Sequence, residues 1–228
     1  MSPPAVHNAS AAEADSGFNV DVVRRAARAL RDGQVIAIPT DTVYGLAAAI
    51  GRPDAIERLY AIKGRPAEKA IPVLIADPAH VYRLTPRLSA TAVRLARDFW
   101  PGALTLVVPA LPGLPPRVTT LTSDGTMTVA VRVPDNLVAR AITAAAGGAL
   151  AVTSANRSGA APAVEGREVR ELRLPGSLLV IDGGRTPGGM ASTIVAATTE
   201  RPEVLREGAI PVTAIAVALA DVAPDERG

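Results

Sequence analysis

The stretch QVIAIPTDTVYGL, residues 34–46, decides the fold class. Its first half is a continuous, β-branched apolar run that ends at Pro39, which predicts a strand buried on both faces. The preceding segment, Asp21 to Gly33, has apolar residues at helical spacing and a glycine at its end. The following turn, TDTVYGL, is polar and contains glycine. A helix, a buried strand and a polar loop in this order are typical of an α/β domain.

The same alternation recurs along the chain. Further helices are predicted over residues 54–62, 89–100, 136–146 and 165–174. Strands are predicted over residues 71–76, 103–109, 127–133, 149–153, 177–182, 192–196 and 202–206. No internal repeat and no linker between two cores is visible. The pattern therefore predicts one α/β domain with a mixed, twisted sheet and helices on its faces.

Length and composition agree with a packed domain. The chain has 228 residues, of which 48% are hydrophobic and 20% charged, enough for a sizeable core. We expect the domain to span residues 18–220, with disordered tails at 1–17 and 221–228. The N-terminal segment has no basic start and no apolar run, and the apolar stretch Ala209–Ala220 is shorter than the roughly 20 residues that a membrane span needs. We therefore expect a soluble, cytoplasmic protein that does not bind membranes.

The residue inventory limits the possible chemistry. Cysteine is absent and only two histidines occur, His7 and His80, which argues against disulfide scaffolds, thiol nucleophiles, zinc sites and Ser–His hydrolases. No metal ligands are predicted. Only two of the 24 basic residues are lysines, and both, Lys63 and Lys69, stand in the loop KGRPAEK. Catalysis would have to use hydroxyl, amide, lysine and arginine groups.

Polar, glycine-containing loops follow three of the predicted strands: PTDTVYG, SANRSG and DGGRTPGG. Ligands bind outside the carboxyl ends of strands in open α/β sheets, so these loops are expected to meet at one pocket. Their hydroxyl, backbone N–H and cationic groups suit phosphate. Neither a Walker A pattern nor G-x-G-x-x-G is present, which disfavours a P-loop ATPase and a classical dinucleotide-binding fold.

Purely structural interpretations of these residues remain open at this point. Thr40 and Thr42 are suited to capping the turn after Pro39, and Lys63 with Arg65 to complementing a helix dipole. In the same way, Ser154 and Asn156 are ordinary turn formers. Arg132 is different, because its neighbours predict a buried strand, in which an unpaired guanidinium is costly.

Taken together, PTDTVYGL, KGRPAEK, FWPGALTLVV, VAVRVP, SANRSG, ASTIV and VLREGAI resemble, in this order, the YrdC-like family of L-threonylcarbamoyladenylate synthases. The resemblance runs from about Val20 to Ile210. It implies a single α/β domain with a twisted, largely parallel sheet and a large, positively charged concave cleft. It also implies an enzyme that condenses L-threonine, bicarbonate and ATP, with Mg²⁺ accompanying the nucleotide, into threonylcarbamoyl-AMP and pyrophosphate.

The resemblance further implies that a separate transferase complex receives the product and modifies an adenosine of tRNA. By resemblance, the catalytic residues are Lys63, Arg65, Ser154 and Asn156, which also contact the nucleotide. Further nucleotide contacts are implied for Lys69, Thr128, Ser192 and Arg206. L-threonine contacts are implied for Thr40, Arg132, Val152 and Asp182.

The sequence departs from the family pattern in a few places. Ala70 stands where relatives usually have proline, and Pro162 or Ala163 stands where they usually have a serine, so one hydroxyl contact to ATP is in question. The short segment after Ala209 indicates a form without the additional C-terminal domain of longer relatives.

Two other functions are considered. One is a carbamoyl-adenylate-forming relative of the kind used in hydrogenase maturation, which the absence of cysteine disfavours. The other is a non-catalytic module that binds double-stranded RNA or tRNA, and weak RNA binding is also compatible with the enzyme.

Overall fold

The computed structural model describes residues 6–8, 19–66, 68–175 and 178–220. The strands in this part of the chain are β1 (Val6–Asn8), β2 (Ile36–Ile38), β3 (Gly45–Ala49), β4 (Val73–Ile75), β5 (Leu104–Pro109), β6 (Thr119–Leu121), β7 (Met127–Arg132), β8 (Ala149–Ser154), β9 (Leu179–Asp182), β10 (Thr193–Ala196) and β11 (Glu203–Arg206). The α-helices are α1 (Val20–Arg31), α2 (Pro53–Lys63), α3 (Ala90–Phe99), α4 (Leu137–Ala145), α5 (Gly166–Glu171) and α6 (Val212–Ala220), and the 3₁₀ helices are η2 (Pro78–Arg83) and η3 (Pro116–Val118).

These strands form one mixed sheet, which confirms the predicted α/β class. Its order is β1-β9-β2-β3-β8-β4-β7-β5-β10-β11, with β6 paired to β7. The pairs β1–β9, β2–β9, β4–β7 and β5–β10 run parallel. The other six pairs of the described strands run antiparallel, so parallel pairing is less dominant than the sequence predicts. The reason is that β2–β3, β6–β7 and β10–β11 are joined by connections too short for a parallel crossover.

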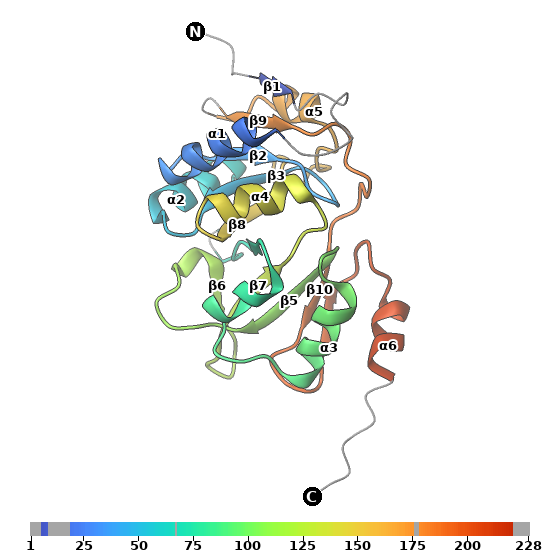
Figure 1. Ribbon diagram of the computed structural model, residues 1–228. Helices are drawn as coiled ribbons and strands as arrows, with labels where there is room; N and C mark the ends of the chain where they lie inside the picture. Colours follow the sequence, from blue (N-terminus) through green and yellow to red (C-terminus); the bar gives the residue numbers. More distant parts are fainter. Residues whose placement is uncertain (1–5, 9–18, 67, 176–177, 221–228) are drawn as a thin grey trace, which may run out of the picture.

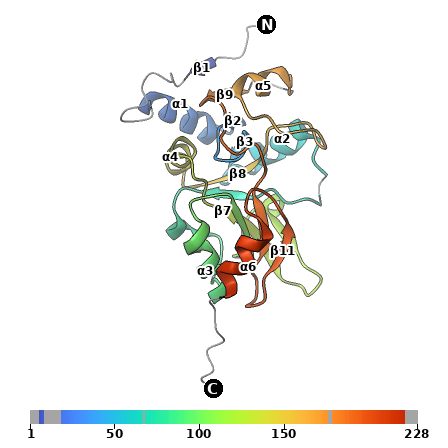
Figure 2. The ribbon, with the colours of Figure 1, turned by 90° about the vertical axis from the view of Figure 1, so that its right-hand side faces the viewer.

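Each face of the sheet has its own core. Helices α1 and α4 pack together on one face, over β2, β3 and β8 (Figure 1). Val73, Val131 and Leu106 point to the opposite face and belong to the larger core cluster, to which α2 and α3 contribute. Helix α6 packs on α3 at the end of the molecule where β11 lies (Figure 2). Helices α1 and α4 cover only part of their face, and the remainder, over β7, β5, β10 and β11, is open.

Local sequence signals explain where several helices begin and end. The side chain of Asn19 caps α1 by accepting from the amides of Asp21 and Val22, and Ser89 caps α3 by accepting from Ala92. Helix α2 ends at Gly64, whose φ of 62° is a left-handed conformation that favours glycine. This glycine turns the chain into the loop that carries Arg65 and Lys69.

Strands β1, β3 and β6, helix α6 and both 3₁₀ helices were not predicted from the sequence. Strand β3, GLAAA, has no β-branched residue and forms because it pairs with both β2 and β8. Helix α6 lies within an apolar stretch that gave no clear periodicity. Strand β1 pairs with β9 inside the segment expected to be a disordered tail; the rest of that tail, and residues 221–228, lie outside the described residues. Within the described part, no helix is both long and apolar enough to cross a membrane.

The fully buried hydroxyl of Thr193 attaches the C-terminal segment to the sheet. It donates to the carbonyl of Ile210 (2.5 Å) and accepts from the amides of Gly208 (2.9 Å) and Ile210 (3.1 Å). We expect Thr193→Val to lower the free energy of unfolding by about 2 kcal/mol, because two buried amides and a carbonyl lose their partner. Urea denaturation measures the change. Thr193→Ser keeps the hydroxyl and should cost less, and equal stability of Thr193→Val and wild type would contradict this account.

Candidate active site

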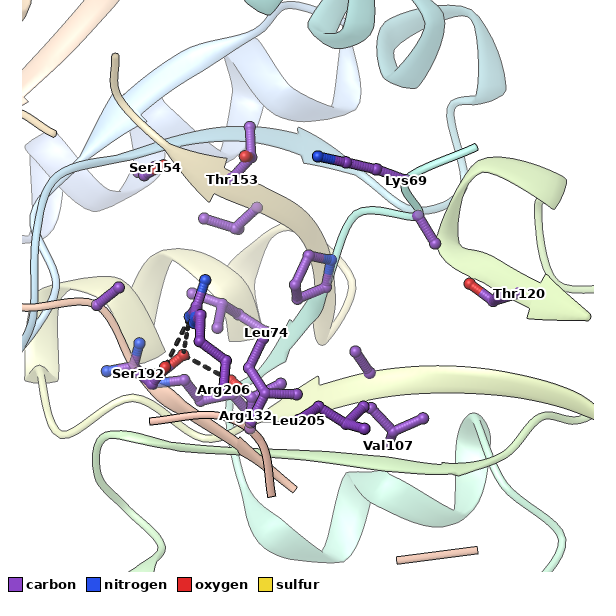
Figure 3. Close-up of a pocket in the computed structure, with 18 of the residues that line it drawn as sticks. Lys69, Leu74, Val107, Thr120, Arg132, Thr153, Ser154, Ser192, Leu205 and Arg206 are labelled. Atoms are coloured by element: carbon purple, nitrogen blue, oxygen red, sulfur yellow. Dashed lines mark hydrogen bonds between the residues drawn. The ribbon is translucent and has the colours of Figure 1, made fainter. Parts of the chain in front are cut away.

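A cavity of about 600 Å³ lies on the open part of the sheet. Its floor is formed by strands β7, β5, β10 and β11, and loops 40–45, 65–70 and 191–192 close its sides (Figure 3). Strand geometry selects the floor residues, because successive side chains of a strand point to opposite faces. In β7, Val129 and Val131 enter the core, while Thr128, Ala130 and Arg132 line the cavity. The side chains of β7 therefore contribute alternately to the hydrophobic core and to the cavity lining.

Arg132 is the buried cation of the site, with 6% of its surface exposed. Its guanidinium donates to the Gly102 carbonyl (2.9 Å), the Thr42 hydroxyl (2.9 Å) and the Asp41 carboxylate (2.6 Å). Burial lowers the pKa of Arg132, and the Asp41 charge partly offsets that effect. These three bonds use three of the five N–H groups of an arginine side chain, which leaves two for a ligand.

The loop after β2 is shaped by hydroxyl groups. Thr40 Oγ1 donates to the Val43 carbonyl (2.7 Å), accepts from the Thr42 amide (3.1 Å) and shares a hydrogen bond with Thr42 Oγ1 (3.0 Å). The turn-capping interpretation of these threonines is therefore confirmed. Both also line the cavity, so capping and facing a ligand are compatible roles.

Lys63 lies behind the cavity wall rather than in it. Its ammonium donates to the carbonyl oxygen of Ser154, to Ser154 Oγ (2.9 Å) and to Asn156 Oδ1 (2.6 Å). Ser154 Oγ donates in turn to Asn156 Oδ1 (2.7 Å) and faces the cavity. Burial, and secondarily the charge of Arg65, lower the pKa of Lys63 to about 8. Three residues that the sequence predicted together thus form one hydrogen-bonded group at the end of β8.

The remaining cations approach the cavity from opposite sides. Arg65 is held by the carbonyls of Lys69 and Ala70, at 2.7 Å each. Arg206 donates to the Ser192 carbonyl (2.6 Å), and Ser192 Oγ shares a hydrogen bond with Thr105 (2.8 Å). In Figure 3, Lys69 lies across the cavity from Arg206 and Ser192. Burial and the charges of Arg132 and Arg65 lower the pKa of Arg206, so the three arginines are close enough to interact electrostatically, and each is a cation suited to an anionic group.

Most of the residues predicted for the site converge on this cavity. The lining includes Thr40, Arg65, Lys69, Thr128, Arg132, Val152, Ser154, Ser192 and Arg206. Lys63 and Asn156 contact it only through Ser154.

Asp182 differs from the expectation for an L-threonine contact. It does not line the cavity, since its carboxylate is engaged by Arg170 (2.8 Å), the Gly184 amide (3.1 Å) and Tyr44 (3.4 Å). Tyr44 fixes the loop after β9 by donating to the Gly184 carbonyl (2.7 Å), and burial raises the pKa of Tyr44 to about 12. Asp182 therefore positions this loop.

Asp41 and Thr105 were not predicted to belong to the site, and the contact between Thr42 and Arg132 was not predicted either. The local signal for Asp41 was its place in a polar loop after a strand, but its partner lies 91 positions away in the sequence. At the position of the expected serine, the backbone of Ala163 bonds to Tyr44 and Ala155. The segment therefore supports β3 and β8 through its main chain.

The described residues hold no group of three or more His, Cys, Asp or Glu side chains that could bind a metal ion. Glu68 and Glu203 are the carboxylates in the cavity lining, and they come from a loop and from β11. The lining therefore fits a ligand that brings its own cation better than a dedicated metal cage.

Known proteins resemble this chain in sequence and in structure. The family profile Sua5_yciO_yrdC, described as "Telomere recombination", matches residues 28–208. Threonylcarbamoyl-AMP synthase of Bacillus subtilis (strain 168) is 40% identical over 190 residues, covering 82% of this chain and 54% of the relative. That of Pyrococcus abyssi (strain GE5 / Orsay) is 36% identical over 200 residues, covering 88% and 58%.

A crystal structure of P. abyssi Sua5 complexed with L-threonine superposes with a TM-score of 0.82 at 33% identity. The superposition covers 89% of this chain and 58% of that one. The chain thus spans little more than half the length of these relatives.

The buried pair of Asp41 and Arg132 should dominate the stability of the site. We expect Asp41→Asn to lower the free energy of unfolding by about 3 kcal/mol, because the Arg132 guanidinium stays buried without a counter-charge. Chemical denaturation provides the measurement. Asp54→Asn is the matched control, since Asp54 pairs with Arg52 and Arg58 in an exposed position, where a pair contributes less than about 1 kcal/mol. Equal losses in the two variants would contradict the assignment.

Lys63 should also give stability a characteristic pH dependence. Its pKa is about 8 in the folded chain and about 10.5 ordinarily, so between these pH values the unfolded chain binds more protons. Stability attributable to Lys63 therefore rises with pH across this window, by up to about 1.4 kcal/mol per pH unit. Urea denaturation of wild type and Lys63→Met from pH 7 to pH 10.5 should give curves with different slopes. A Lys63→Met curve that runs parallel to that of wild type would contradict this account of Lys63.

Proposed function

This chain belongs to the Sua5/YciO/YrdC family, and from that premise we propose that it is a threonylcarbamoyl-AMP synthase, a nucleotidyltransferase that uses L-threonine, bicarbonate and ATP. The observation that carries the proposal is the cavity. Residues that the family resemblance assigns to nucleotide and to L-threonine line one space, under three arginines. Relatives named for this activity, and a related structure complexed with L-threonine, support it.

The reaction has two bond-forming steps. The amine of L-threonine attacks the carbon of bicarbonate, and water leaves as the carbamate forms. A carbamate oxygen then attacks the α-phosphorus of ATP and displaces pyrophosphate. Both steps bring anions together, so positioning and charge neutralisation supply much of the catalysis and no protein nucleophile is needed. That demand agrees with a site without cysteine or histidine in its lining.

Different residues of the cavity lining suit the two substrates. The two unused N–H groups of Arg132, beside the Thr40 hydroxyl, are suited to the carboxylate and hydroxyl of L-threonine. Arg65, Lys69, Ser154, Ser192 and Arg206 are suited to phosphates. Lys63 and Asn156 act in this proposal through Ser154, whose hydroxyl they orient.

Mg²⁺, when bound, would neutralise phosphate charge. Of the two carboxylates in the lining, Glu68, next to Lys69, would lie beside such a complex, and most of the Mg²⁺ ligands would be phosphate oxygens and water. The chain's own contribution is the ring of arginines that binds the remaining charge.

The proposal extends to the cellular role. Residues 18–220 form the catalytic domain, and the product passes to a transferase complex that modifies tRNA in the cytoplasm. Weak RNA contact at the cationic mouth of the cavity belongs to the same proposal.

The first test is the reaction itself. Purified protein with ATP, L-threonine and bicarbonate should release pyrophosphate, and omission of any one substrate should abolish release. Turnover without threonine would contradict the proposal, and turnover with carbamoyl phosphate in place of threonine and bicarbonate would favour the carbamoyl-transfer alternative. RNA binding without any ATP binding would favour the non-catalytic module.

Lys63→Arg tests the arrangement behind Ser154. Three acceptors surround the Lys63 ammonium at a buried position, and a longer, planar guanidinium does not fit them although its charge is the same. We expect pyrophosphate release to fall at least tenfold while the thermal midpoint changes little. Lys69→Arg changes an exposed lysine of the same loop and should lose less. Near-normal turnover of Lys63→Arg would overturn this role of Lys63.

A further inference from the structure

The floor of the cavity carries a row of cross-strand partners, one from each of four strands. Ala130 pairs with Val107, Val107 pairs with Ala196, and Ala196 pairs with Glu203. All four residues line the cavity. The first three are small or β-branched and half-buried, and the fourth is an exposed carboxylate on the last strand of the sheet. We call Ala130, Val107 and Ala196 the apolar row.

The row lies between two polar bands. On one side lie Arg132, two residues from Ala130 along β7, and Thr105, two residues from Val107 along β5. Arg206 of β11 belongs to the same side, because its partner Ile194 pairs with Thr105. Side chains two residues apart on one strand face are about 7 Å apart. On the other side lies Thr128, which pairs with Thr120. The floor therefore changes from cationic to apolar to hydroxyl-bearing along the strands.

The cationic band and the apolar row lie in the order, and at about the distance, expected for the phosphate and the base of a nucleotide. A phosphate bound at Arg206 places the ribose between the cationic band and the apolar row, and the base over the apolar row. The row spans two strand spacings, about 10 Å, and small side chains leave space above it for a flat ring. Apolar floor under a planar base, with polar groups at its edges, is the usual composition of a small-molecule site.

Glu203 stands at the end of that row without a side-chain hydrogen bond or ion pair to any other described residue. Its carboxylate accepts hydrogen bonds and cannot donate them when ionised. A base that reaches it with an amine is favoured, whereas a base that presents a carbonyl oxygen at the same position brings two hydrogen-bond acceptors together, which repel each other.

We propose that the apolar row binds the face of the purine ring and that Glu203 accepts a hydrogen bond from the exocyclic amine of adenine, which selects ATP over nucleotides with a 6-carbonyl group. This inference rests on the proposed function, because it places the nucleotide of that reaction. It assigns to Glu203 a specificity role separate from the phosphate contacts.

Calorimetric titration with ATP and with ITP, whose base has a carbonyl in place of the amine, tests the role of Glu203. Glu203→Gln removes the charge and supplies an amide donor, so ATP should bind more weakly and ITP more tightly. We expect the ATP-to-ITP affinity ratio to fall at least tenfold. Glu68→Gln is the matched control, because Glu68 is the other carboxylate of the lining, and it should leave the ratio unchanged.

Ala196→Leu tests the apolar row itself. Its longer side chain would occupy the space above the row, so ATP affinity should fall at least tenfold while the thermal midpoint stays within a few degrees, since the residue faces the cavity. Unchanged ATP affinity in this variant would overturn the placement of the base.

The outcomes separate this inference from the proposed function. If Glu203→Gln leaves the ATP-to-ITP affinity ratio unchanged and still releases pyrophosphate from ATP, the role of Glu203 alone is overturned. Glu203 would then be a charged residue that prevents β11, an edge strand, from pairing with another chain. Absence of ATP binding and of pyrophosphate release in the wild-type protein overturns the proposed function.

Discussion

A guanidinium buried at the end of a strand must be hydrogen-bonded and compensated, and the arrangement around Arg132 satisfies that requirement. Its partners come from two separate segments: Asp41 and Thr42 after β2, and Gly102 before β5. The ion pair therefore joins the loop after β2 to the middle of the sheet. Because that loop also contributes to the cavity wall, the geometry of the wall depends on one buried pair.

Incomplete coverage of the sheet creates the cavity. Helices α1 and α4 cover one end of their face, and among the described elements no helix covers the β7–β11 end of that face (Figure 1). In the open part of the sheet, the apolar row lies between arginines on one side and threonines on the other. Burial stabilises one end of the sheet while the other end is available for a ligand.

Lys63 shows how position determines the role of a residue. An ammonium at this site satisfies three oxygens and supports the hydroxyl of Ser154, whereas the arginines of the site lie where their planar groups meet the cavity. Lysine carries a compact charge with three donors, and arginine a broad fork, so the two are not interchangeable here. The scarcity of lysine in the chain thus coincides with a site in which lysine is specifically accommodated.

Much of the fold and site was determined by the sequence by itself. Buried apolar runs such as 34–39 and 127–133 predicted strands, and caps such as Ser89 and Gly33 set helix limits, because these signals act within a few residues. The resemblance of KGRPAEK, SANRSG and VLREGAI to a known family identified Arg65, Ser154 and Arg206. Tertiary structure alone decided the rest. It paired Asp41 with Arg132, removed Asp182 from the cavity wall, made β3 a strand despite its alanines and aligned Ala130, Val107, Ala196 and Glu203 in one row. Each of these depends on strand register and on contacts between distant segments, which no local pattern encodes.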